Sequence, residues 1–293
     1  GDLHWWRLGF YQAEGSKGPI GHDFSVANKL ALPLQEMITA LTLSWNIDRE
    51  RLRMQVLYRE NTQPEPAVAI YSPLGVRISA VQERKDKRGV IGDHAGVLHV
   101  NNSMPLRRMA NLALSHIFKN AFPSREAAKA YTLGWLDGDG TITIGSISNS
   151  IEIRLAGSRD EQEVVFRALH TAYSWDIYAG AFGKIEGSTN RALSLSQAAD
   201  LAADGAFQFS ISRARLIHML SKRLRSYRHQ GNSLTSPADA DRAQIIFDTH
   251  LTEEADLLLK YPEAARNFCG TADKNEKCIP YPIEINRKRP LGI

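Results

Sequence analysis

The sequence has few cysteines, and their scarcity argues against two classes of small stabilised scaffold, although a disulfide or metal role for the two that occur is the alternative. Only Cys269 and Cys278 occur among 293 residues, with no CxxC pair and no Cys/His quartet at zinc-finger spacing. A disulfide framework and a structural zinc centre are therefore not expected. We expect two free thiols in a reducing intracellular compartment, which the sequence leaves open between organelle, nucleus and prokaryotic cytoplasm.

Long apolar runs are also missing. No stretch approaches the roughly 20 apolar residues that cross a bilayer, and the first residues, "GDLHWWRLGF", lack the pattern of a signal peptide. No membrane partner is expected. With 43% hydrophobic and 23% charged residues, the composition is that of a globular protein with one large core or two smaller ones.

Positive charge is unevenly distributed along the chain. Residues 1–123 carry 15 Lys/Arg against 11 Asp/Glu, whereas residues 124–293 carry 21 of each. Within residues 205–238 there are six basic residues and no acid: Arg213, Arg215, Lys222, Arg223, Arg225 and Arg228. A second basic cluster lies at 84–88. Such patches suit a phosphate backbone, although a solvated helix face would give the same pattern.

Hydrophobic periodicity predicts the elements of the first half. Helices are expected at 4–14, 32–45 and 105–121, and strands at 24–27, 51–59, 67–72 and 75–81. Pro105 suits the first turn of the last helix.

The order of elements then starts again. Ser124 is expected to cap a helix that runs to Asp139. Helices are also expected at 158–175, 212–230 and 253–260, and strands at 141–146, 150–157, 177–185 and 191–197. The order helix–strand–strand–helix–strand–strand–helix therefore recurs roughly twice.

Two helix ends match each other in sequence. "RLGFYQAEG" (7–15) and "TLGWLDGDG" (132–140) share small residues, an acid and a glycine in the same frame. Gly9 with Ala13, and Gly134 with Gly138, are four residues apart and so share a helix face. Small residues on one face let two helix backbones approach closely, so a parallel helix pair is expected here.

That pairing would bring two acids together, Glu14 and Asp139. A carboxylate at a helix C-terminus faces the negative end of the dipole, and two neighbouring carboxylates repel. A bound Mg²⁺ offsets both costs and, beside a basic surface, suits phosphodiester hydrolysis. A calcium loop does not fit, because Trp135 and Ser146 occupy two ligand positions. An ordinary Asp-Gly turn remains an alternative for 130–146, but it leaves the match at 7–15 unexplained.

The paired stretches resemble the two LAGLIDADG motifs of single-chain homing endonucleases, and the resemblance extends over nearly residues 1–230. It implies an α+β fold of two αββαββα domains related by a pseudo-twofold axis, each with an antiparallel, saddle-shaped sheet. The expected domains are 1–123 and 124–293, the second with a C-terminal extension from about residue 231. The expected activity is Mg²⁺-dependent hydrolysis of a long double-stranded DNA target with a staggered break, by a monomer.

The resemblance also implies roles for individual residues. Glu14 and Asp139 would be the catalytic metal ligands, one for each DNA strand, with Mn²⁺ or Ca²⁺ as other possible occupants. The interface positions would be Gly9, Ala13, Gly134 and Gly138. Lys222 and Arg108 are the nearest matches to the accessory basic catalytic residues. Gln12 stands where the motif often has Asp, at a position that does not bind metal.

Contacts to DNA would come from basic and amide side chains on the strands and from the basic loop. The candidates are Arg51, Arg53, Gln55, Arg77, Lys85, Lys87, Arg154, Lys184 and Arg191. Arginine, lysine and glutamine suit guanine and adenine edges, although phosphate contacts are an equal alternative for about half of them. An RNA-binding intron maturase, or a catalytically silent DNA-binding protein of the same fold, is the alternative function.

Overall fold

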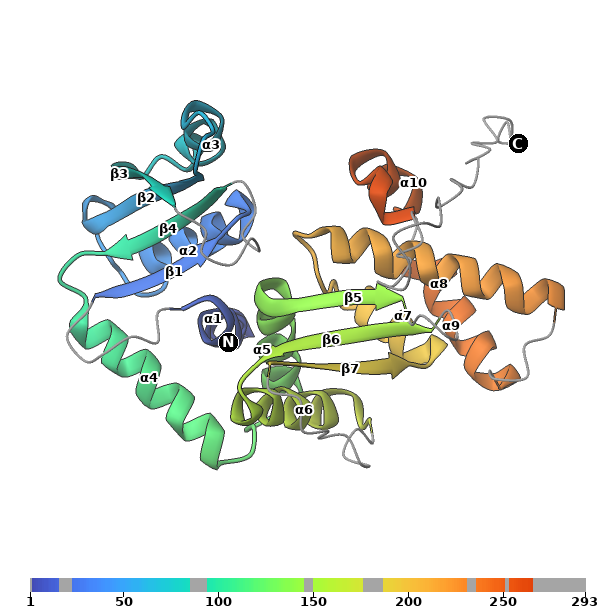
Figure 1. The fold of residues 1–293 in the computed structure, drawn as a ribbon. Coiled ribbons are helices and arrows are strands. Elements are labelled where there is room, and N and C mark those ends of the chain that lie inside the picture. The colour runs from blue at the N-terminus through green and yellow to red at the C-terminus, as the bar shows by residue number, and fades with distance from the viewer. Residues whose placement is uncertain are drawn as a thin grey trace.

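The computed structural model describes residues 2–15, 23–84, 94–144, 150–175, 187–230, 236–250 and 253–265. These residues form ten α-helices and two sheets, so the predicted α+β class is confirmed. Figure 1 shows helices α1 and α5 side by side between two parts that each contain a sheet.

The first half contains a four-stranded sheet. Its elements are α1 (Asp2–Glu14), β1 (Phe24–Asn28), α2 (Ala31–Leu43), β2 (Leu52–Arg59), α3 (Glu65–Tyr71), β3 (Arg77–Arg84), β4 (His94–Val100) and α4 (Met104–Lys119). The strand order is β1-β4-β2-β3, and only the β2–β3 pair is parallel. Apolar side chains of α1, α2 and α4 cover one face of this sheet.

The strand predicted at 67–72 is wrong, because this segment belongs to α3. Pro64 and Pro66 flank the helix start, where proline is well tolerated, and the following apolar run is too short for its period to decide between helix and strand. Residues 60–76 thus form a crossover, which explains why β2 and β3 are parallel. The first half therefore departs from the predicted αββαββα order and from a purely antiparallel sheet. Strand β4 was not predicted.

The second half contains a three-stranded antiparallel sheet, β5-β6-β7. Its elements are α5 (Arg125–Asp139), β5 (Gly140–Ile144), β6 (Ile151–Gly157), α6 (Arg159–Tyr173), β7 (Gly187–Leu193), α7 (Leu195–Ala203) and α8 (Ile211–Gln230). Ser124 caps α5 as predicted, and its side chain accepts a hydrogen bond from the Ala127 amide.

Two strand predictions in this half have different outcomes. The strand expected at 177–185 lies outside the described residues. The strand expected at 191–197 is only partly right, because β7 ends at Leu193 and Ser194 then caps α7 in a capping box with Gln197. A serine that accepts from the amide three residues later starts a helix, and this local bond ends the strand.

Part of the C-terminal extension packs on the second half. Helix α9 (Pro237–His250) lies against α7, and α10 (Glu254–Lys260) lies against α8. Glu253 pairs with Arg213, and Glu254 accepts from His218 Nδ1 at 3.0 Å. Arg213 is buried and also donates to the carbonyl of Ala202, so it cannot belong to a phosphate-binding patch. Part of the basic segment 205–238 is thus engaged in ion pairs and hydrogen bonds within the protein.

Helices α1 and α5 run parallel and touch backbone to backbone. A Cβ atom added at Gly9 would lie 2.0 Å from the Tyr131 carbonyl oxygen, and one at Gly134 would lie 1.9 Å from the Trp6 carbonyl oxygen. Gly9 and Gly134 are 125 residues apart, and so are Trp6 and Tyr131, so each contact is the counterpart of the other. The two motifs are separated by the same 125 residues. The contact is therefore twofold-symmetric in its detail. Among the described residues, no helix is long and apolar enough to cross a membrane.

This contact predicts the effect of a methyl group in the interface. Gly134→Ala is expected to lower the free energy of unfolding by about 1–3 kcal/mol, because overpacking separates two backbones, and this outweighs a helix-propensity gain of about 1 kcal/mol. Urea denaturation followed by circular dichroism measures the change. Ser115→Ala, on the exposed face of α4, is the control and should change stability by less than about 0.5 kcal/mol. Equal stability of Gly134→Ala and wild type would contradict the tight contact.

Candidate functional site

Two hydrogen bonds repeat the symmetry of the helix pair. Trp6 Nε1 donates to Asp137 Oδ2 at 3.0 Å, and the Tyr131 hydroxyl donates to Gln12 Oε1. Trp6 and Tyr131 are 125 residues apart, and so are Gln12 and Asp137, so each pair occupies corresponding positions in the two helices. Each helix thus supplies one aromatic donor and one acceptor to its partner.

Asp137 also joins the helix pair to the turn before α8. Its Oδ1 accepts from the Gln208 amide at 2.8 Å, so both oxygens have donors. Burial raises the pKa of the Asp137 carboxyl to about 7, while the bonds from Trp6 and Gln208 oppose this rise. A carboxyl with this environment holds elements together and is not placed to meet substrate.

The two predicted metal ligands stand just beyond the last contact of the helices. A Cβ atom at Gly138 would lie 2.5 Å from the Ala13 Cβ and 3.0 Å from the Glu14 Cγ. Glu14 follows Ala13 in α1 and Asp139 follows Gly138 in α5, and both acids are partly exposed. The predicted interface residues Gly9, Ala13, Gly134 and Gly138 all lie at this helix pair, with the acids at its C-terminal end.

Glu14 is held by a neighbour that the sequence did not single out. Asn28 Nδ2, at the end of β1, donates to Glu14 Oε1 at 2.8 Å. An oxygen that accepts from an amide still has lone pairs for a cation, so this bond orients the carboxylate without excluding a metal. Two carboxylates are hard oxygen donors that suit Mg²⁺, which usually keeps several waters and needs only one or two carboxylates. In the described part of the chain, no group of three or more Asp, Glu, His or Cys forms a metal cage.

The predicted accessory basic residues lie on helices other than those that carry the two acids. Lys222 is exposed on α8, ten residues beyond Ser212, whose hydroxyl accepts from the Ile142 amide of β5. Ten helical residues span about 15 Å, which places Lys222 well along α8 from this contact. Arg108 is exposed on α4. Its neighbour Arg107, in contrast, is buried. Burial raises the pKa of Tyr11, and the charge and hydrogen bond of Arg107 oppose this rise.

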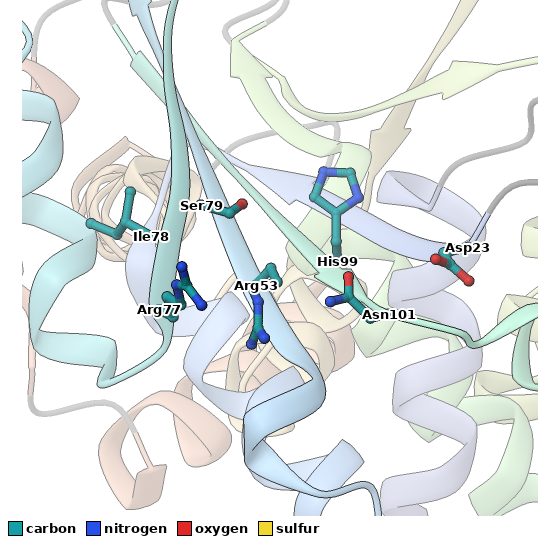
Figure 2. A pocket seen from close by; sticks show the side chains of 7 residues that line it. All are labelled: Asp23, Arg53, Arg77, Ile78, Ser79, His99 and Asn101. Atoms are coloured by element: carbon teal, nitrogen blue, oxygen red, sulfur yellow. The ribbon is translucent and has the colours of Figure 1, made fainter.

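A polar hollow of about 360 Å³ opens on the face of the first sheet that lies opposite the apolar core. Figure 2 shows side chains from β2, β3 and β4 around it, among them Arg53, Arg77, Ser79 and His99. Arg53 and Gln55 alternate along β2 with the buried Leu52, Met54 and Val56, which explains why they reach the open face. This alternation is the signal that the sequence offered. His99 was missed because β4 was not recognised as a strand.

The hollow favours an anion. Arg77 is exposed, and Arg53 uses one nitrogen, Nη1, on the carbonyls of Glu50 and Leu52. The one carboxylate at its edge, Asp23, already accepts from the backbone amides of residues 102 and 103. Burial lowers the pKa of His99, against the charge of Asp23, so the two arginines supply the positive charge.

The other predicted DNA contacts have different surroundings. Arg51 donates to the carbonyls of residues 101 and 102, which ties it to the turn after β4. Arg154 is exposed on the uncovered face of the second sheet, opposite Thr141. Arg191 is paired with the buried Ile153 and lies over the Phe166 ring of α6, so it is on the covered face and its assignment as a groove-facing residue is wrong. Lys85, Lys87 and Lys184 lie outside the described residues.

The chain matches no protein-family model, and no curated protein is significantly similar to it in sequence. Any function must therefore be argued from the site itself. That site consists of two acids at the end of a symmetric helix pair and an arginine-lined hollow on an open sheet face.

The hydrogen bonds of Asp137 lead to a prediction about stability. Asp137→Asn must turn an NH₂ group towards either the Trp6 N–H or the Gln208 N–H, since both oxygens now accept. A buried donor left without an acceptor costs about 1–3 kcal/mol, so the midpoint of urea denaturation should fall accordingly. Asp160→Asn, on the exposed first turn of α6, is the control and should have a small effect. An Asp137→Asn protein as stable as wild type would show that these bonds do not hold the interface.

Proposed function

We propose that the chain is a site-specific DNA endonuclease of the LAGLIDADG type, which makes a staggered double-strand break by Mg²⁺-dependent hydrolysis. The observation that carries this proposal is the exchange symmetry of α1 and α5, because it brings two equivalent acids to the same end of one interface. Two equivalent acids suit two equivalent reactions on antiparallel DNA strands.

The arrangement of strands around the two helices supports the same fold. Gly15, directly after α1, pairs with Val26 of β1, and Gly140, directly after α5, pairs with Leu155 of β6. In both halves the motif helix is therefore followed by an antiparallel pair and then by a helix, α2 or α6. On this view α3 and β3 are an insertion into an αββαββα half, and β4 corresponds to β7.

Glu14 and Asp139 are the residues that would hold the metal. When bound, Mg²⁺ activates a water molecule and neutralises charge on the phosphate. The protein's own contribution is orientation: the close helix contact fixes the two helix ends, and Asn28 fixes the Glu14 carboxylate. Asp137 is turned into the interface by Trp6 and Gln208, whereas Asp139 is the partly exposed acid of the second motif.

The open face of the first sheet would bind the DNA. Arg53 and Arg77 bring two positive charges to a hollow on that face, and Gln55 joins His99 to Gln82 across three strands. Arginine pairs well with phosphate or guanine, and amides with adenine. On the second sheet, Arg154 is the described basic residue on the corresponding uncovered face.

Cleavage of DNA tests the proposed function directly. The full chain is incubated with a randomised duplex library in Mg²⁺ or in EDTA, and cut ends are captured and sequenced. We expect Mg²⁺-dependent cutting of a small set of related long sites, and a loss of about 10²-fold or more for Asp139→Ala. Glu163→Gln, an exposed acid of α6, is the matched control and should cut at the wild-type rate. Absence of cutting on every duplex, or full activity of Asp139→Ala, would refute the proposal; selective binding of RNA without cleavage would favour a maturase.

Binding as a function of salt tests the role of the hollow separately from catalysis. Arg77→Ala should weaken binding of the selected duplex and reduce the slope of log K against log salt by about 1, because one phosphate contact releases about one counterion. Lys260→Ala, an exposed cation of α10, should leave the slope unchanged. Fluorescence anisotropy in Ca²⁺ measures both. The same slope in wild type and Arg77→Ala would place DNA elsewhere.

A further inference from the structure

Asn28 is built into the structure in one fixed orientation. Its side-chain oxygen accepts from the Leu30 amide at 2.8 Å, so its NH₂ group must face the other way, towards Glu14 Oε1. The residue is buried at the end of β1. Its carbonyl oxygen also accepts from the buried Tyr71 hydroxyl at 3.2 Å, which ties the strand end to α3. Both the amide and the backbone that carries it are therefore fixed before any ligand arrives.

At the strand position that corresponds to Asn28, the second half carries no side-chain amide. Gly15 pairs with Val26 and Gly140 pairs with Leu155, so Val26 and Leu155 occupy corresponding positions. Two residues further along each strand stand Asn28 and Gly157. Gly157 has no side chain and cannot donate to Asp139 as Asn28 donates to Glu14. The contact between Asn28 and Glu14 is therefore not repeated at this position of the second half, although the helices that carry the two acids are symmetric.

We infer that Asn28 is a positioning residue for Glu14, and that its loss weakens metal binding and strand cleavage at the Glu14 half of the site without affecting the Asp139 half. The inference rests on the proposed function, since it assigns Glu14 to a metal and to one DNA strand. Asn28 itself would contact neither DNA nor metal. It limits the rotation of the Glu14 side chain, which is longer than that of Asp139 by one methylene and has more freedom to lose.

Strand-specific cleavage tests the inference. Asn28→Asp keeps the acceptor for the Leu30 amide but replaces the donor to Glu14 with an oxygen. On a supercoiled plasmid that carries the target, this variant should cut one strand about 10-fold or more slowly, the usual effect of losing a residue that orients a ligand. The slowed strand should be the one that Glu14→Gln leaves uncut, so nicked circles should accumulate. Asn120→Asp, at the exposed end of α4, is the matched control and should give the wild-type ratio of strand rates.

Metal binding provides a second readout that needs no cleavage. Mn²⁺ binding, followed by electron paramagnetic resonance, should weaken about 10-fold in Asn28→Asp for the site that Glu14→Gln removes, and should remain unchanged for the site that Asp139→Ala removes. Circular dichroism verifies the fold of each variant, and Asn28→Ser, which is smaller and uncharged, replaces Asn28→Asp if the latter does not fold.

The outcomes separate the two proposals. If wild type cuts DNA and the Asn28 variants cut both strands at wild-type rates, or slow both equally, the positioning role is wrong and the endonuclease function remains. If wild type cuts no duplex, the proposed function is wrong. In that case the Mn²⁺ measurement still tests the positioning role. If Asn28→Asp binds Mn²⁺ as wild type does, the positioning role is also wrong, whereas weaker binding at the Glu14 site alone supports the positioning role.

Discussion

A close contact joins two helix backbones, and most of the site depends on it. Gly9 and Gly134 each meet a carbonyl of the opposite helix, at a separation that leaves no room for a side chain. This contact fixes the parallel direction of α1 and α5, and hence the common end at which Glu14 and Asp139 stand. The cores of the two halves lie on either side of the pair, so the helices position both sheets as well as the acids.

Around this symmetric centre, the two halves have diverged in ways that bear on binding. The crossover through α3 gives the first sheet an additional parallel edge strand, and with it the hollow that contains Arg77. In the second half, the sheet is smaller as described, and α9 and α10 pack against α7 and α8. The structure thus combines a shared helix interface with two different sheet surfaces. Under the proposed function, these surfaces would contact two halves of a target that differ in sequence.

Local signals in the sequence were enough to predict the motif helices and the strands that follow the second one. Ser124 caps α5, and β5 and β6 alternate clearly. Where the deciding interaction is tertiary, prediction failed: α3 begins at two prolines and depends on the burial of Tyr71 against the sheet, and Gly96 in β4 packs on that ring. Asn28 was missed for the same reason, because a strand-end asparagine has no special pattern until folding brings Glu14 beside it.

The paired hydrogen bonds also determine which halves fit together. Each aromatic donor faces the acceptor of the other half, Trp6 with Asp137 and Tyr131 with Gln12. Two copies of the second half, joined by the same symmetry, would bury two Asp137 carboxyls in one interface, where burial already raises the pKa of a single one to about 7. The cost of removing two carboxylates from water therefore disfavours pairing of the second half with a copy of itself. The first half, in the same chain, offers the uncharged Gln12 in place of a second Asp137, so pairing of the two different halves is preferred.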